Sequence, residues 1–177
     1  MQVRVLASDV AIGTLICGIG DVAAQKYALS CQDVSTFDVQ RCGAMSSYGF
    51  AAAFPYHFYY ESLAKNVRGL WAKTAIDTLL VVPFFEVPAV HLWTATFGLN
   101  LGPEAAVAHL RRNYAEAVVD GLVIWAPSSL LIFRFVQPRW HLTAFYAVGA
   151  CWDAAMSRLS FGDGRQSPPP GQSTPGS

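Results

Sequence analysis

The sequence predicts an all-α protein: a polytopic integral membrane bundle of about four to five membrane helices plus one interfacial amphipathic helix. Hydrophobic residues make up 53% of the 177 residues and charged residues only 14%, whereas roughly 25% charged residues is usual in soluble domains. The stretch from residue 42 to residue 60 contains no Asp, Glu, Lys or Arg and is about long enough to cross a bilayer. The five Trp and seven Tyr residues suit the aromatic belts of membrane interfaces.

Two architectures fit this composition. One is the buried helical core of a soluble protein, and the other is a membrane bundle with charges in its interior. Isolated acidic residues such as Asp21 and Asp77 interrupt the apolar segments and are compatible with both. The membrane bundle is favoured because helices of soluble proteins need a polar face, which most of these segments lack.

Polar or proline-containing stretches divide the chain into successive predicted helices. Their approximate ranges are 3–29, 38–63, 71–99, 104–119, 120–136 and 139–161. Asp38 is one of three candidates to cap the second helix, and Pro83 and Pro88 are expected to kink the third, which a membrane tolerates. The bundle is assigned to residues 1–161, and residues 162–177 form a tail rich in Pro, Gly and Ser.

The segment 104–119 differs from the others because its apolar residues are periodic. Leu110, Tyr114 and Val118 recur four residues apart, together with Val107, as in an amphipathic helix that lies at a membrane interface. The apolar face is expected to contact acyl chains or protein. Arg111 and Arg112 are expected to reach lipid phosphates or acidic groups of a partner, and His109, Asn113 and Glu116 are assigned away from the apolar face.

Composition and motifs argue against several functional classes. Lys plus Arg and Asp plus Glu both number 12, so no nucleic-acid partner is predicted. The glycines of GIGDVAAQ lack the third glycine or the lysine of nucleotide-binding loops. The four Cys and four His residues are scattered, so no metal site is predicted, and no catalytic motif points to an enzyme. No cofactor is expected beyond structural phospholipids such as cardiolipin.

Charged residues inside apolar segments are the most informative feature. A charge at bilayer depth costs roughly 2.5–3.5 kcal/mol on insertion scales, so it faces the bundle interior, a partner or water. Asp21 or Asp77 is therefore expected to pair with Arg41 or another interior donor. Two roles stay open: lining of a conduction path, and a structural ion pair. Small residues four apart, namely Gly20 and Ala24, Gly43 and Ser47, and Gly49 and Ala53, are expected at close helix contacts.

Short motifs along the chain match those of a known family in order and spacing. The matching positions are Gly20, Asp21 and Gln25 in GDVAAQ, Asp38 and Arg41, Gly49, Pro55 and His57, Lys73, Asp77 and Pro83, Trp125, and Trp152. Over roughly residues 7–160 the chain resembles the Mpv-seventeen / twenty-two-kilodalton peroxisomal membrane protein family. The resemblance implies a small polytopic protein of mitochondrial inner or peroxisomal membranes, with Asp21 as an interior carboxylate. Such proteins are associated with small-solute channel activity and with maintenance of mitochondrial DNA.

The chain departs from the family pattern at several polar positions. Thr78 and Ser129 stand where the family usually has Gln, and Ile132 stands where it has Asn. Because groups that would line a pathway are lost, the sequence favours a scaffold: a non-enzymatic accessory subunit of a large mitochondrial inner-membrane complex, either respiratory or ATP synthase. Other membrane subunits in a hetero-oligomer and membrane lipids are then the expected partners. The alternative is a weakly selective small-solute channel of the mitochondrial inner or peroxisomal membrane.

Overall fold

The computed structural model describes residues 2–30 and 36–150, and the ordered elements in this part of the chain are all helices. The elements are α1 (Gln2–Ser30), α2 (Val39–Asn66), α3 (Leu70–Ala75), η1 (Ile76–Glu86), α4 (Val87–Trp93), η2 (Thr94–Gly98), α5 (Pro103–Phe135) and η3 (Pro138–Trp140). Residues 141–150 form a further helical segment. The predicted tail and Trp152 lie outside the described residues.

Three of the described helices are long and apolar enough to cross a membrane. They are Leu6–Lys26 within α1, Leu70–Gly98, and Pro103–Phe135. The second of these joins α3, η1, α4 and η2 without a break, as the predicted segment 71–99 requires. The 28-residue helix α2 is as long but does not reach the same apolarity. The predicted class, a polytopic helical membrane protein, is confirmed.

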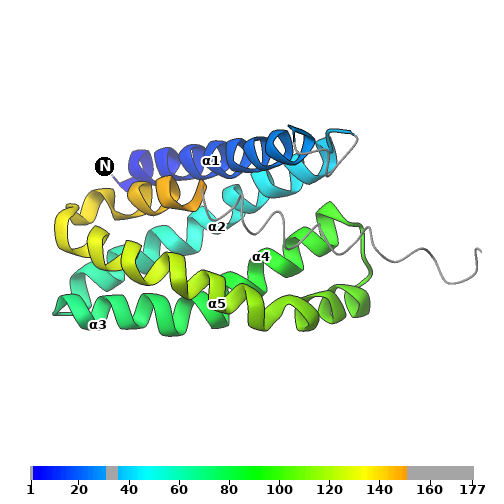
Figure 1. Ribbon diagram of the computed structural model, residues 1–177. Helices are drawn as coiled ribbons and strands as arrows, with labels where there is room; N and C mark the ends of the chain where they lie inside the picture. Colours follow the sequence, from blue (N-terminus) through cyan, green and yellow to red (C-terminus); the bar gives the residue numbers. More distant parts are fainter. Residues whose placement is uncertain (1, 31–35, 151–177) are drawn as a thin grey trace, which may run out of the picture.

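Consecutive long helices of the bundle run antiparallel to one another (Figure 1). Helix α1 packs along α2, while the helix of residues 70–98 packs along α5. The connection of residues 99–102 is short, which forces the helices that it joins to run side by side in opposite directions. The segment 141–150 returns beside α1 (Figure 1), where Tyr146 lies against Gly13.

Prolines change the backbone of the 70–98 helix without ending it. Residues 76–86 are π-helical and include Pro83, and in such a stretch a carbonyl accepts a hydrogen bond from the residue five positions ahead. For Pro83 that residue is Pro88, which has no N–H. The Tyr114 hydroxyl on α5 donates to the Pro83 carbonyl at 3.0 Å instead. A neighbouring helix thus satisfies the backbone group that the proline leaves unpaired, as membrane helices require.

The prediction of a separate interfacial helix at residues 104–119 was wrong. Residues 103–135 form one continuous helix, α5, and all of it lies within one candidate span. Its 33 residues extend about 50 Å at 1.5 Å per residue, whereas the hydrocarbon core is about 30 Å thick. The helix is therefore longer than a single perpendicular crossing requires, and residues 104–119 are a continuous part of it.

The assignment of faces in this segment also needs correction. His109 and Asn113 are buried, whereas Val107 is 40% exposed. Leu110, Tyr114 and Val118 are partly buried against the core. The polar residues face the bundle interior, where they contact other polar groups. Asn113 Nδ2 lies 3.4 Å from His109 Nε2, and the His109 ring lies beside His91.

Close approach of α1 and α2 depends on glycine. A Cβ on Gly49 would lie 2.8 Å from the Cys17 sulfur and closer still to the Gly13 carbonyl oxygen, and a Cβ on Gly18 would meet the Ser46 hydroxyl. Gly49 thus lies at a helix contact, as predicted. Gly43 does not, because nothing lies within 4 Å of a Cβ built there.

Replacing Gly49 by Ala is expected to destabilise the protein by about 1–3 kcal/mol, because the methyl group has to displace the α1 backbone. Gly43→Ala is the matched control on the same helix. It is expected to leave stability unchanged or raise it by up to about 1 kcal/mol through helix propensity. Thermal unfolding of the two variants in detergent measures the difference. Equal midpoints would show that this crossing is not tightly packed.

Candidate functional site

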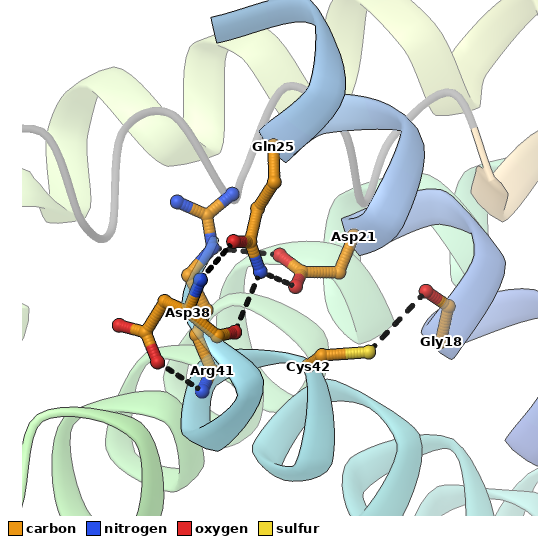
Figure 2. Close-up of polar contacts among 6 residues, drawn as sticks. All are labelled: Gly18, Asp21, Gln25, Asp38, Arg41 and Cys42. Carbon is orange, nitrogen blue, oxygen red and sulfur yellow. Dashed lines mark hydrogen bonds and ion pairs between the residues drawn. The ribbon is translucent and has the colours of Figure 1, made fainter. Parts of the chain in front are cut away.

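A buried polar network joins the end of α1 to the start of α2 (Figure 2). Asp21 is fully buried, and the Arg41 Nε donates to its Oδ1 at 2.7 Å. The Gln25 side-chain amide donates to the other carboxylate oxygen, also at 2.7 Å. The predicted pairing of an interior acid with Arg41 is confirmed for Asp21.

Asp38 completes this network from the start of α2. Its Oδ1 accepts the backbone N–H of Arg41 at 3.0 Å, so it is the N-cap and satisfies a donor that the helix end leaves unpaired. The Gln25 side chain accepts from the Asp38 backbone N–H at 2.6 Å and donates to the Asp38 carbonyl at 2.9 Å. Figure 2 shows these contacts closing around one helix end, so the network is an internal brace rather than an open lining.

A second polar group gathers where α2, η1 and α5 meet. Asp77 on η1 is buried, and it accepts hydrogen bonds from the Ser129 hydroxyl of α5 and from the Tyr59 hydroxyl of α2 at 3.2 Å. At the far end of η1, Glu86 accepts from the Tyr56 hydroxyl of α2. Two carboxylates on one membrane helix are thus held by hydroxyl groups of its neighbours.

A cavity of about 60 Å³ lies beside these carboxylates. Both Asp77 and Glu86 line it, together with Cys17, Trp125 and Tyr146 from the surrounding helices. In the part of the chain that the structure describes, neither carboxylate forms an ion pair with Lys, Arg or His. The cavity wall is mainly apolar apart from these acids and a few hydroxyl groups, and its volume is enough for a few water molecules at about 10–15 Å³ each.

Two buried histidines form a third polar group, between α4 and α5. His91 and His109 are 0% and 2% exposed, and their ring centroids lie 5.9 Å apart. Sequence analysis missed this group because it treated the histidines separately and placed His109 on the outer face. Within the described residues, no three His, Cys, Asp or Glu side chains come together as a metal site would require.

The other predicted site residues lie apart from one another. His57 Nδ1 is 2.6 Å from an Asp9 carboxylate oxygen, Lys73 is half-buried on α3, and Gly20 is buried on α1. Trp125 faces the cavity. Arg111 and Arg112 are exposed, whereas the Tyr114 hydroxyl binds the Pro83 carbonyl inside the bundle. The residues that sequence reasoning missed are Glu86, Tyr56 and Tyr59. The signal in the sequence was a second acid, Glu86, nine residues beyond Asp77 in the same apolar segment.

Comparison with known proteins identifies what the chain is similar to. A model of the Mpv17 / PMP22 family matches residues 99–157. The mitochondrial inner membrane protein Mpv17 of Danio rerio is 26% identical over 151 residues, which cover 82% of this chain and 83% of that protein. The chain is thus similar to the Mpv17 / PMP22 family over residues 99–157 and to this relative over most of its length. Together with the three candidate spans, the likeness supports a polytopic helical membrane protein.

Two further relatives extend the likeness over most of the chain. PXMP2/4 family protein 1 of Dictyostelium discoideum is 24% identical and covers 90% of the chain and 80% of that relative. Protein sym-1 of Neurospora crassa is also 24% identical and covers 90% of the chain and 94% of that relative. No solved structure matches the chain significantly.

Removing one partner of the Asp21–Arg41 pair is expected to destabilise the protein by about 3–5 kcal/mol, because the other charge stays buried without its counterpart. Either Asp21→Asn or Arg41→Gln tests this. The double variant is expected to recover part of the loss, since two neutral amides leave no buried charge. Thermal unfolding in detergent is the measurement.

The control for this prediction is Lys65→Gln, which breaks the exposed pair between Lys65 and Glu61 and is expected to cost less than about 1 kcal/mol. A double variant as unstable as the sum of the two single variants would contradict the account, because it would mean that the two charges do not act as a pair.

Proposed function

We propose that this protein lets small polar solutes, with a preference for cations, cross its membrane. The observation that supports this is the interior cavity with Asp77 and Glu86 in its wall. Acidic side chains inside membrane bundles are costly and commonly mark ion or solute pathways. This ranking reverses the preference drawn from sequence alone, which took the loss of polar family positions as a loss of the pathway.

Ser129 shows why that inference from the lost positions fails. It replaces a larger polar residue of the family pattern, yet it is fully buried and donates to Asp77. The interior carboxylate therefore keeps a partner on α5. What changes is size: a hydroxymethyl group fills less of the space beside Asp77 than a Gln side chain would.

The sign of the interior charge supports the preference for cations. Among the described residues, no basic side chain is paired with Asp77 or Glu86, and rings of carboxylates select cations in membrane pores. Tyr56 and Tyr59 hold the two acids through their hydroxyl groups, so movement of α2 against η1 would change access to both. The described state is narrow, as in a closed pathway.

We place the protein in the mitochondrial inner membrane. The support is the relative from Danio rerio, whose name states that location. The peroxisomal membrane is the alternative that the family resemblance implies. Neither location requires the chain to be an enzyme, and the proposal is of a non-enzymatic protein.

The test is conductance of the purified full-length protein in planar bilayers under a salt gradient. The double change Asp77→Asn and Glu86→Gln is expected to move the cation-to-anion permeability ratio toward unity, because it removes the interior negative charge. Asp120→Asn is the matched control, since Asp120 lies on α5 but does not line the cavity, and it is expected to leave the ratio unchanged.

Cys17 offers an independent check, because its side chain lines the same cavity. In a variant that keeps Cys17 as its sole cysteine, a small cationic thiol reagent is expected to reduce the conductance. The matched variant with Cys17→Ala is expected to be unaffected. Two results would overturn the proposal. One is conductance at background level from correctly folded wild-type protein, and the other is a cation-to-anion permeability ratio that does not change when both acids are replaced.

The second candidate is an accessory subunit of a larger inner-membrane complex, and the outer surface favours it. An apolar groove of about 790 Å³ runs between α2 and the 70–98 helix. Exposed aromatic residues beside it include Phe85, 66% exposed, and Phe97, 52% exposed. Apolar patches of this extent mark either lipid-facing surface or a protein interface.

The subunit candidate predicts that the wild-type protein, solubilised in mild detergent, migrates on a native gel far above monomer mass together with respiratory or ATP synthase subunits. Phe85→Ser with Phe97→Ser is expected to weaken that association, whereas Leu15→Ser with Ile19→Ser on α1 is not. The α1 pair is similarly exposed, at 62% and 63%, but lies outside the groove. Migration at monomer mass or as a small homo-oligomer rules out the subunit role.

A further inference from the structure

One end of the bundle carries a concentration of basic side chains. They are Lys65 at the end of α2, Arg68 in the connection to α3, Lys73 on α3, Arg134 at the end of α5, and Arg139 in η3. We call these five residues the basic rim. Helix α3 contacts α5, and η3 contacts α2. The five residues therefore lie at the same end of the bundle, on the left in Figure 1.

The basic rim has little acidic compensation. Among the described side chains there, the acids are Glu61, which pairs with Lys65 at 2.8 Å, and Asp9, which pairs with His57 at 2.6 Å. With His57 counted as neutral, five cations and two acids leave three positive charges. At the opposite end, Lys26, Arg111 and Arg112 are matched by Asp38, Glu104 and Glu116, and Arg41 is paired with Asp21. The described charges are therefore balanced at one end and strongly positive at the other.

Exposed aromatic residues surround the basic rim. Trp71 is 73% exposed, Phe135 is 75% exposed and Trp140 is 51% exposed. The Arg134 guanidinium lies 5.6 Å from the centroid of the Phe135 ring, and that of Arg139 lies 5.5 Å from the Trp140 ring. Amphipathic rings of this kind sit at the level of lipid headgroups. Two candidate spans also end here, at Leu70 and Phe135.

These observations indicate both the depth of the basic rim in the membrane and the sign of its charge. The spans end where hydrocarbon gives way to headgroups, the tryptophans mark that level, and the cations extend from it into the layer of lipid phosphates. Basic clusters beside membrane helices attract anionic lipids, and arginine binds phosphate oxygens in a bidentate fashion. We infer that the basic rim binds the headgroup phosphates of anionic phospholipids in the leaflet at this end of the bundle. This inference does not depend on passage of solute through the interior.

The experiment is a lipid titration of the delipidated full-length protein in neutral detergent, with bound lipid counted by native mass spectrometry. Phosphatidylglycerol is the anionic probe and phosphatidylcholine is the zwitterionic reference. The rim variant Arg68→Gln, Arg134→Gln and Arg139→Gln is expected to bind phosphatidylglycerol at least about tenfold more weakly, with phosphatidylcholine unaffected.

Three controls make the result specific. The triple variant Lys26→Gln, Arg111→Gln and Arg112→Gln removes the same charge from the opposite end and is expected to change the affinity less than about twofold. A rim variant with all three arginines replaced by Lys keeps the charge and is expected to retain the preference for phosphatidylglycerol. Inorganic phosphate at millimolar concentration is the third arm, and it is expected not to displace the lipid.

Several outcomes would overturn the inference. One is equal weakening by the two glutamine triples, which would show a general effect of net charge. Another is wild-type binding of phosphatidylglycerol that is no tighter than that of phosphatidylcholine. Full displacement by inorganic phosphate would show that the rim recognises free anions rather than lipid. If the glutamine variant fails to fold, loss of the lipid preference in the lysine variant at high salt still supports the inference, and its persistence there contradicts it.

Discussion

Polar groups buried between membrane helices must find partners within the protein, because hydrocarbon offers none. Much of this bundle is held together by that constraint. Arg41 of α2 donates to Asp21 of α1, Ser129 of α5 donates to Asp77 of the 70–98 helix, and Tyr114 of α5 donates to a carbonyl that Pro88 leaves unpaired. Each contact joins two different helices, so the hydrogen bond that satisfies a polar group also holds one helix against another.

The polar groups differ in how completely they are satisfied. The Arg41 guanidinium and the Gln25 amide donate to the two oxygens of the Asp21 carboxylate, and the backbone of Asp38 forms hydrogen bonds with the Gln25 amide. This leaves the network little freedom, and it works as a brace between two helix ends. Asp77 and Glu86 accept hydrogen bonds from the hydroxyl groups of Ser129, Tyr59 and Tyr56, and they border a cavity. Hydroxyl groups rotate easily and exchange readily with water, so this interior is better suited to change.

Much of the fold follows from the sequence because hydropathy and caps act locally. The apolar segments gave the helix ranges, Asp38 marked the start of α2, and the cost of a buried charge predicted the Asp21–Arg41 pair. The faces of residues 104–119 were not predictable in this way. A helical wheel places His109 and Asn113 toward water. In the folded bundle, however, His91 lies beside His109, and it comes from a helix whose register no local rule determines. The role of Ser129 was missed for a related reason. In the sequence, Ser in place of Gln was taken as the loss of a polar group, and the contact of Ser129 with Asp77 became evident only in the folded structure.

The position of the π-helical stretch connects these observations. Residues 76–86 carry both cavity carboxylates close to the ends of the stretch, and Pro83 lies between them. A wider helical turn with a missing donor has weaker backbone hydrogen bonding than an α-helix, and such turns are frequent at functional sites. The same stretch depends on hydroxyl groups of α2 and α5 for its acids and for the Pro83 carbonyl. The helix that is least secured by its own backbone thus borders the cavity, whereas α1 and α2, which meet through close glycine contacts, provide the rigid wall against which it can move.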